Sequence, residues 1–430
     1  LGSPDLPNPP WGLIEPEPLA LITPVLEEAF REKDRASWIE VLRTHDVPCQ
    51  PIQSREEFVN SELAASNKVM DSIEHPELGV LGMPSQPLHL EECPSAPMRR
   101  APEIGENTEA VLKEKHEPGT GAGQGGPPLE GTRAIDLASF IAGPVITRHL
   151  AMLGSDVIKV ESPDADPFRD FSPHFNGWNQ GKRGIALDLK RVEDKEFLYK
   201  LVEAADVVVE NFRPGVAERL GCSTQELRAA RDDLVLVKSP GYGADVSRAD
   251  QPAFDPLLQA LGGMMVAQGG DGEPVFLTVP VHDAATPIIA AFGTVTALYY
   301  RAICGKAQTV HTSLAQTTAA AQVAEFVSYE GREKPAIGGF DYKGPEQAQR
   351  YLEENGEWVW SDQEGKSVVE RNGFACSPLA IANDLVCQHQ DSPGWGPIHQ
   401  VGQLIRGAGS HPERAPYLNE HEAELHLEFD

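Results

Sequence analysis

From Thr132 onward, short runs of β-branched and apolar residues alternate with longer segments whose apolar residues recur at helical spacing. Such runs predict buried strands, and the longer segments predict helices. Strands that alternate with helices predict an α/β domain with an open, parallel, doubly wound sheet. We place this Rossmann-like domain at residues 132–250, with strands in "RAIDLA", "DVIKVE", "GIALDL", "DVVVEN" and "DLVLVKS".

The rest of the chain divides into segments that differ in hydrophobic pattern and composition. Residues 251–328 predict a helical continuation around a glycine-rich turn, and residues 329–430 a smaller α+β domain with a weaker pattern. Residues 1–116 alternate polar helical patterns with proline-rich extended segments. The glycines of residues 117–131 resemble a phosphate loop, but no strand precedes them and prolines follow. We therefore interpret this stretch as a flexible linker.

The chain repeats one short segment. Residues 99–112 and 413–427 each hold Arg-Ala-Pro followed by an acidic, helix-like end. We call these two repeats closing segments, because each has the form of a segment that ends a domain. Two of them are unexpected in one domain and expected in a tandem of two domains. The sequence also starts with leucine rather than methionine, so we expect a processed or excised part of a longer protein.

The composition limits the kinds of binding partner and the cellular location that we expect. With 65 acidic against 36 basic residues, the net charge of −29 disfavours nucleic acid and anionic membranes. The six cysteines form no C-x-x-C pair, which favours reduced thiols and a cytoplasmic location. The longest apolar run, around residues 284–299, is interrupted by Thr286, Pro287 and Gly293. It is shorter than the roughly 20 residues of a membrane span, so we expect none.

Two stretches offer chemistry. In "HDAATPIIAAFGTV" one carboxylate, Asp283, precedes an apolar helical pattern. It is either helix punctuation, with Thr286 and Pro287 as N-cap and first helical residue, or a catalytic carboxylate. In "VVVENFRPG" a strand ends at a turn where Asn211, Arg213 and backbone amides are suited to a phosphate or an adenine edge. An ordinary solvated turn explains the same residues.

Several motifs in order resemble the family III CoA-transferases, a group that also contains α-methylacyl-CoA racemases. They are "IDLASFIAGP", "GSDVIKVESPDADPFR", "NQGKRGIALDLK", "ADVVVENFRPGVAERLG", "FDPLLQALGGMM" and "HDAATP", within residues 132–328. Residues 11–112 resemble the C-terminal end of the same family, with "SWIEVLRTHDVPCQPIQSREEF" and "RAPEIGENTEAVL". The chain thus resembles a family tail followed by a head and a second, eroded tail.

The resemblance implies a CoA-binding α/β domain, a smaller second domain and two interlocked copies. It makes Asp283 the nucleophile, which stays ionised near a helix N-terminus and attacks an acyl-CoA thioester. An aspartyl anhydride and an enzyme thioester follow, and a small carboxylic acid takes the CoA, without a metal. Local amides would hold the oxyanions.

The resemblance also assigns contacts to CoA. The residues implied are Phe140, Leu187, Lys190, Asn211, Phe212, Arg213, Arg219 and Leu220. Two places where family members often carry basic residues hold Ser162 and Pro252, which suggests reduced CoA affinity. The glycine-rich loop that covers the family's active site has a weak counterpart in "AIGGF", residues 336–340.

Two alternatives stay open. In racemase relatives a histidine precedes the aspartate aligned with Asp255, but this chain has Phe254, and we expect His282 to point away from Asp283. The second alternative is that the chain is a non-catalytic half of a tandem transferase. The acyl donor and acceptor stay open among oxalate, succinate, carnitine-like acids and aromatic acids.

Assembly follows from the tail. Residues 11–112 cannot build a sheet alone, so we expect apolar side chains of this segment to be buried on a head domain. The predicted anchors are Trp38, Ile39, Leu42 and Val47. We expect a homodimer, or one half of a pseudo-dimer in a longer chain, with both halves near Asp283.

Overall fold

The structure is a computed structural model that describes 16–91, 126–339 except 171, 244 and 249, 342, 349–352, 358–361, 386–389, 398–401 and 421–429. It contains two compact units, Leu1–Pro51 and Ile52–Asp430, which we describe separately. The predicted boundaries at residues 116, 131, 250 and 328 stay predictions. The first closing segment, residues 99–112, and most of the predicted linker lie outside the described residues.

The first unit contains two helices, α1 (Pro16–Phe30) and α2 (Arg35–Thr44). Asp34 caps α2, because its Oδ1 accepts a hydrogen bond from the Ser37 amide at 2.8 Å. The Phe30 and Trp38 rings pack edge to face with centroids 5.1 Å apart. No residue of α2, all of which the structure describes, is buried.

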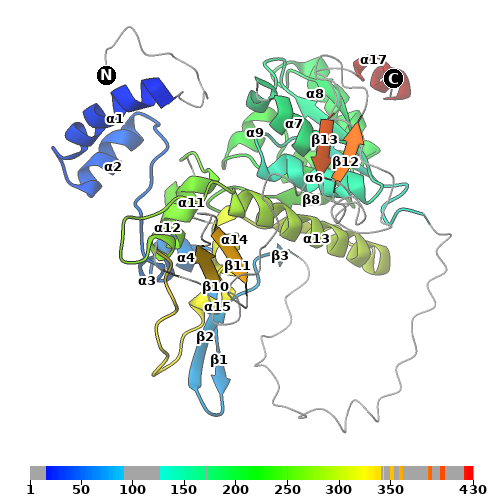
Figure 1. The fold of residues 1–430 in the computed structure, drawn as a ribbon. Helices are drawn as coiled ribbons and strands as arrows, with labels where there is room; N and C mark the ends of the chain where they lie inside the picture. Colours follow the sequence, from blue (N-terminus) through cyan, green and yellow to red (C-terminus); the bar gives the residue numbers. More distant parts are fainter. Residues whose placement is uncertain are drawn as a thin grey trace. The chain divides into compact units, whose positions relative to one another are not determined.

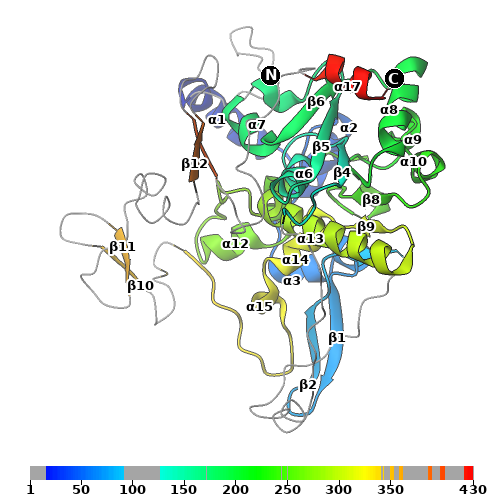
Figure 2. The same cartoon turned by 90° about the vertical axis from the view of Figure 1, so that its right-hand side faces the viewer.

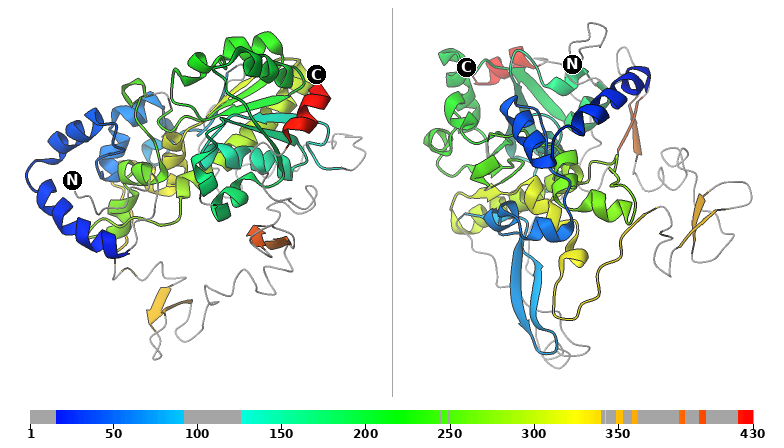
Figure 3. Two further views of the ribbon diagram at one scale, coloured as in Figure 1. Left: turned by 90° about the horizontal axis from the view of Figure 1, so that it is seen from above. Right: turned by 90° about the vertical axis from the view of Figure 1, so that its left-hand side faces the viewer.

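A seven-stranded sheet forms the centre of the second unit (Figure 1). Its order is β3-β9-β8-β7-β4-β5-β6, parallel except for β3, which pairs antiparallel with β9. Figure 3 shows the strands side by side, seen from above. The strands are β3 (His89–Leu90), β4 (Arg133–Asp136), β5 (Asp156–Glu161), β6 (Lys182–Ala186), β7 (Val207–Glu210), β8 (Val235–Lys238) and β9 (Thr309–His311).

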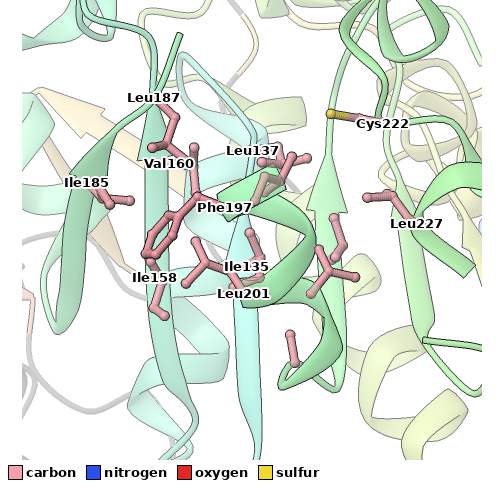
Figure 4. Close-up of a cluster of buried hydrophobic side chains, with 14 of the residues drawn as sticks. Ile135, Leu137, Ile158, Val160, Ile185, Leu187, Phe197, Leu201, Cys222 and Leu227 are labelled. Carbon is pink, nitrogen blue, oxygen red and sulfur yellow. The ribbon is translucent and has the colours of Figure 1, made fainter. Parts of the chain in front are cut away.

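Helices cover both faces of the sheet because alternate strand residues point to opposite sides. On one face, Ile135, Ile158 and Ile185 pack in one cluster with Phe197 and Leu201 (Figure 4). That face is covered by α8 (Val192–Glu203), α9 (Val216–Leu220), α10 (Thr224–Ala230) and α17 (Glu422–Phe429). Residues of α6 (Ala142–Met152) and α13 (Val281–Cys304) pack on the other face. The predicted α/β class with a doubly wound sheet is confirmed.

The order of the strands reverses at β4. From β4 the chain passes outward through β5 and β6, returns to β7 on the other side of β4, and continues through β8 and β9. Open α/β sheets bind ligands at the carboxyl ends of the strands where this reversal occurs. A ligand-binding site is therefore expected at the carboxyl ends of β4 and β7.

Helix α13 begins at Val281 rather than at Thr286, so the predicted start of this helix was wrong. Pro287 lies inside the helix, where it lacks an N–H that would bond the Asp283 carbonyl. The Thr286 hydroxyl donates to Thr317 Oγ1 at 2.8 Å instead of capping the helix. The amides that a cap must satisfy lie further upstream, at His282 and Asp283.

Helix α13 is also long and apolar enough, by length and composition, to cross a membrane. One face packs on the sheet, where Ala290, Ala291 and Ala297 join the core cluster beside β4, β7 and β8. This packing is that of a core helix. The opposite face exposes a stripe of apolar side chains: Ile288, Phe292, Tyr299 and Ile303.

Residues 52–91 pack on helices of the second unit and add the outer strand β3 to its sheet. They form α3 (Arg55–Val59), α4 (Glu62–Ser66) and the hairpin β1 (Met70–His75) and β2 (Gly79–Pro84), seen best in Figure 2, and then β3. Phe58 and Leu63 are buried in a cluster with Leu258, Leu314 and Phe326. Phe58 and Leu63 thus anchor residues 52–91 within the second unit. Trp38, Ile39, Leu42 and Val47 belong to the first unit, and their burial on a head domain stays a prediction. Helical periodicity marks an apolar face but does not identify its partner.

The end of the second closing segment covers the outer strand β6. Leu425 of α17 is fully buried in the core cluster. The His421 amide donates to the Gly184 carbonyl at 3.0 Å, and the Gly184 amide donates to His421 Nδ1 at 3.1 Å. Arg183 Nη1 lies 2.8 Å from Glu428 Oε2. A sheet edge that would otherwise be open is protected in this way.

The other described elements are short. Helices α11 (Asp255–Leu261), α12 (Met264–Gly269), α14 (Leu314–Ala320) and α15 (Val323–Phe326) lie beside α3 and α4, and α7 (Ser172–Asn179) contacts α6. Two antiparallel pairs follow: β10 (Gln349–Leu352) with β11 (Trp358–Ser361), and β12 (Val386–His389) with β13 (Ile398–Val401). The 3-10 helices are η1 (Pro167–Asp170) and η2 (Val246–Arg248).

We predict that Phe58→Ala lowers the free energy of unfolding of the second unit by about 3 to 5 kcal/mol. The reason is that the Phe58 ring is fully buried and packs against Phe326 with centroids 5.6 Å apart. Urea denaturation followed by circular dichroism measures the change. Val80→Ala, at a β2 position that is 61% exposed, is the control and should have little effect. A loss below about 1 kcal/mol for Phe58→Ala would contradict this packing.

Candidate active site

Asn211, directly after β7, bonds the loop that follows β4. Its Oδ1 accepts from the Ser139 amide at 3.1 Å, and its Nδ2 donates to the Ser139 carbonyl at 2.8 Å. Both backbone groups belong to the loop that follows β4. Gly143 is required here, because a Cβ atom would lie 2.3 Å from Ala138 Cβ and 3.0 Å from Asn211 Cγ. Asn211 therefore joins the two strand ends where the sheet order reverses.

The same loop holds Phe140 in a left-handed backbone conformation, with φ at 68°. Such a conformation is uncommon for a bulky residue and is maintained by its surroundings. The Phe140 amide donates to Asp166 Oδ2 at 3.3 Å. The buried Lys159 ammonium donates to the Ala138 carbonyl at 2.9 Å and lies 3.4 Å from Asp166. A buried ion pair thus fixes the loop on both sides of Ser139.

A second buried lysine supports the start of α6. Lys182 Nζ donates to Asp136 Oδ2 at 2.8 Å, to the Pro144 carbonyl at 2.7 Å and to Asn179 Oδ1 at 2.8 Å. Burial lowers the pKa of Lys182 to about 8. Burial alone would raise the pKa of Asp136, but Lys182 and Lys159 outweigh it and hold that pKa below its usual range. All three ammonium hydrogens are used, so this lysine is structural.

The eight residues predicted to contact CoA follow three parallel strands of the sheet, β4, β6 and β7. Phe140 follows β4, and Leu187 and Lys190 follow β6. The others lie after β7 and on α9: Asn211, Phe212, Arg213, Arg219 and Leu220. Carboxyl ends of parallel strands meet at one edge, so the prediction describes one side of the sheet.

These residues differ in exposure. Lys190, Arg213 and Arg219 are exposed, and Arg213 Nη1 donates to the Asp250 carbonyl at 2.8 Å. Phe212 and Leu220 are half-buried and pack against the core, whereas Leu187 is 4% exposed and lies within it (Figure 4). The three basic side chains are therefore the groups with open access to an anionic ligand.

Glu210, at the end of β7, did not figure in the sequence analysis. Its Oε2 accepts from the Phe212 amide at 2.7 Å, which bends the chain into the turn. Burial raises the pKa of Glu210 to about 7. Its position as the last strand residue before the "NFRPG" turn is the signal that could have identified it.

Asp283 lies in the first turn of α13 and is half-buried. Burial, and after it the negative charge of Asp255, raises the pKa of Asp283 to about 7. The expectation that the helix N-terminus keeps this carboxylate ionised is therefore not met at neutral pH. Roughly equal populations of its two protonation states are expected there.

Besides this burial, another carboxylate occupies the helix N-terminus. Asp255 Oδ2 accepts from the His282 amide at 2.6 Å and from the Asp283 amide at 3.3 Å. Pro280 stands at the N-cap position of α13, and among the described residues no local side chain caps this helix. Burial alone would raise the pKa of Asp255, but hydrogen bonds and charge at His282 outweigh it and hold it below the usual range.

His282 faces Asp255. Its ring is fully buried, with Nδ1 3.3 Å from Asp255 Oδ2, and neither ring nitrogen makes a hydrogen bond with any part of the chain that the structure describes. Phe254, where racemase relatives carry a histidine, packs its ring edge to face on Phe140, 5.6 Å between centroids. A histidine and aspartate pair of the racemase type is thus not assembled by these described residues.

The glycines of the "AIGGF" segment dock on the end of α12. The Gly338 amide donates to the Ala267 carbonyl at 2.5 Å, and the Gly339 amide donates to the Gln268 carbonyl at 2.8 Å. A Cβ atom on Gly338 would lie 2.5 Å from the Gln268 carbonyl oxygen, so only glycine fits. Phe340 lies outside the described residues.

Two further kinds of reactive group occur in the described part of the chain: potential metal ligands and free cysteines. Within it, no group of three or more histidine, cysteine, aspartate or glutamate side chains is placed to hold a metal ion. Cys49, Cys222 and Cys304 are free thiols. Burial raises the pKa of Cys222 to about 12, which makes it unreactive.

The second unit is therefore a doubly wound α/β domain with basic side chains at its carboxyl edge and the half-buried Asp283 at the start of α13, beside the buried Asp255 of α11. Over residues 15–108 and 129–371 the sequence matches the profile of CoA-transferase family III. This match covers more than half of the chain, and the protein belongs to that family. The interruption between the matched stretches contains most of the predicted linker.

Individual relatives are CoA-transferases. The chain is 38% identical over 203 residues to succinyl-CoA:mesaconate CoA-transferase of Haloarcula hispanica, covering 43% of this chain and 51% of that protein. It is 36% identical over 195 residues to formyl-CoA:oxalate CoA-transferase of Streptomyces avermitilis, covering 43% and 47%. The chain thus spans about half the length of the curated relatives it matches.

Solved structures share the fold. A CAIB/BAIF family protein from Brucella suis superposes with a TM-score of 0.62 at 22% identity, over 71% of this chain and all of that chain. At this identity the comparison supports the fold alone.

We predict that Asp283→Asn stabilises the protein at alkaline pH. The pKa is about 7 in the folded state against an ordinary value of 3.8, so the unfolded chain ionises first and wild-type stability falls between about pH 4 and 7. The neutral variant escapes this cost. The pKa difference corresponds to about 4 kcal/mol, which solvent screening of the half-buried side chain reduces to about 1 to 2 kcal/mol above pH 7. Urea denaturation at pH 4.5 and pH 8 measures it. An equal effect of the substitution at both pH values would show that Asp283 has an ordinary pKa.

Proposed function

We propose that this protein is a CoA-transferase in which Asp283 is the nucleophile. The observation that carries this proposal is a half-buried carboxylate with a pKa near 7, at the start of a long helix in a family III chain. A carboxylate whose charge is poorly stabilised is a stronger nucleophile than an exposed one. It is also still substantially ionised at neutral pH.

The reaction proceeds by two acyl exchanges. The Asp283 carboxylate attacks the thioester carbonyl of an acyl-CoA, the C–S bond breaks, and CoA thiolate leaves a mixed anhydride. The thiolate then attacks the aspartyl carbonyl, which releases the donor acid and forms an aspartyl-CoA thioester. The acceptor carboxylate attacks this thioester and displaces CoA thiolate, which finally takes the acyl group of the acceptor and regenerates Asp283. No water, proton or electron is consumed.

CoA binding is proposed for the carboxyl edge of the sheet. Lys190, Arg213 and Arg219 are exposed there and are suited to the phosphates of the nucleotide. The Asn211 and Phe140 loops form the floor at the reversal of strand order. Phe212, Leu187 and Leu220 complete the predicted set from the core side.

The substrates are proposed to be an acyl-CoA and a small carboxylic acid. Relatives bear the names succinyl-CoA:mesaconate, formyl-CoA:oxalate and acetyl-CoA:oxalate CoA-transferase, so short acids and diacids are the first to assay. Neither a metal nor another cofactor is required by this chemistry. A racemase is disfavoured by Phe254, and a cytoplasmic location is part of the proposal.

Assembly is proposed to involve α13. Ile288, Phe292, Tyr299 and Ile303 recur at helical spacing and are each more than half exposed, so they form one apolar stripe. A stripe of this kind on a core helix is typical of a surface that another chain covers. We propose a homodimer, or a pseudo-dimer with another copy of the domain, that buries this stripe.

The test of function uses two crossed variants. Asp283→Ala should abolish CoA exchange between acyl-CoA and acid while CoA affinity, measured by calorimetry, stays nearly unchanged. Arg219→Ala should weaken CoA binding about tenfold or more, because one charged hydrogen bond contributes about 1.5 to 3 kcal/mol, and should still allow Asp283 to be trapped as a hydroxamate by hydroxylamine.

Normal exchange by Asp283→Ala would refute the nucleophile. Wild-type protein that binds CoA but exchanges it with no acid in the panel would favour the non-catalytic half of a tandem transferase.

The assembly proposal predicts that Phe292→Glu dissociates the wild-type oligomer. Phe292 is 65% exposed, so a charge there leaves the fold intact but opposes burial in an interface. Analytical ultracentrifugation of wild type, Phe292→Glu and the control Val192→Glu, at an equally exposed position on α8, measures the change. A monomeric wild type would contradict the homodimer, and an oligomer unaffected by Phe292→Glu would place the interface elsewhere.

A further inference from the structure

Asp255 connects three parts of the fold through one buried carboxylate. It is the first residue of α11 and is 2% exposed. Its Oδ2 accepts from the amides of His282 and Asp283, and its Oδ1 accepts from Gln259 Nε2. Both carboxylate oxygens are therefore committed, and one of them is bound to the backbone of the proposed nucleophile.

Gln259 extends this connection to the segment that enters α13. It is fully buried, its Oε1 accepts from the Leu277 amide at 3.0 Å, and its Nε2 donates to the Leu277 carbonyl at 3.0 Å. The side chain thus pairs with Leu277 as a neighbouring strand would. With Asp255 it holds residues 277–283 against α11.

We propose that Asp255 is a positioning residue for acyl transfer, which fixes the backbone of Asp283 through the first turn of α13 and opposes the negative charge of its side chain. The proposal rests on the proposed function of Asp283. Its two effects come from one group, because the carboxylate that satisfies the helix amides is the like charge beside Asp283. Gln259 assists by orienting Asp255.

The chemical consequence concerns the difference between the free and the acylated enzyme. Ionised Asp283 is repelled by Asp255. The side chain of Asp283 is uncharged when it has become an aspartyl anhydride or thioester. Acylation therefore relieves the repulsion. An interaction that destabilises the free carboxylate and not the acylated form favours the covalent step.

The groups around Asp283 make this assignment testable. Asp255 of α11 supplies the like charge, and the buried His282 ring of α13 lies against Asp255. From α14, Thr317 contributes an uncharged hydroxyl that bonds Thr286. Neutralising Asp255 should therefore change the titration of Asp283 more than any substitution at these neighbours.

The experiment measures the pKa of Asp283 directly, by carboxyl carbon NMR of protein labelled at aspartate, with Asp283→Asn assigning the signal. In Asp255→Asn the pKa should fall by about one pH unit or more. At pH 6 the ionised fraction would then rise about fivefold, and the acid limb of the pH profile of CoA exchange should move down by the same interval. Asp255→Ser is a second neutral variant in case Asp255→Asn does not fold.

Asp245→Asn is the matched control. Asp245 is a buried carboxylate that caps another turn, accepts from the Ser247 amide at 2.9 Å and pairs with Arg248 at 3.1 Å. It should lose stability without changing the pKa of Asp283. Gln259→Leu should lower the yield of trapped Asp283 without lowering its pKa.

An unchanged pKa of Asp283 in a folded neutral variant overturns the inference, whatever the activity. Failure of wild-type protein to form the Asp283 hydroxamate overturns the proposed function instead. The NMR result needs no turnover, so the two failures are distinguishable.

Discussion

The start of helix α13 depends on a carboxylate from another helix. The amides of His282 and Asp283 need acceptors, Pro280 supplies no side-chain oxygen, and Asp255 satisfies both from α11. A buried helix end without such a partner would leave donors unsatisfied at a cost of about 1 to 3 kcal/mol each. The arrangement therefore serves stability first, and it adds to the effect of burial in raising the pKa of Asp283.

The other half of the site is held by buried ion pairs beneath the sheet edge. Lys159 with Asp166 and Lys182 with Asp136 are almost completely buried, and each lysine also bonds a backbone carbonyl of the loop after β4 or of α6. Losing one partner would leave a buried charge unpaired, which is strongly destabilising. The ion pairs thus hold the sheet edge at which we propose that exposed basic side chains bind CoA.

Much of the fold follows from the sequence because buried parallel strands leave a clear pattern. The runs "DVIKVE" and "DVVVEN" are apolar, β-branched and bounded by helices, so β5 and β7 were predicted at their observed places. The start of α13 was not, because its capping residue lies 27 positions away and local signals at Thr286 and Pro287 suggested a later start. A cap supplied across the chain leaves no local pattern.

The site was predicted in part for the same reason. Motifs identified Asp283 and the turn after β7. The raised pKa of Asp283 comes first from burial and then from Asp255, and only the packing of α11 on α13 brings these about. The docking of Phe58 and Leu63 was not predicted either. Phe58 lies in α3 and Leu63 in α4, two short amphipathic helices whose burial depends on the surface that they meet. The helical pattern around Trp38 was stronger in the sequence.

The central claim is that Asp283 exchanges acyl groups through an anhydride, and isotope transfer tests it most directly. After turnover with an acceptor acid whose carboxylate carries heavy oxygen, mass spectrometry of the peptide containing Asp283 measures the label on that side chain. When CoA thiolate attacks the acceptor carbonyl of the anhydride, the bridging oxygen stays with the enzyme. The account predicts heavy oxygen on Asp283, and turnover that leaves Asp283 unlabelled would contradict it.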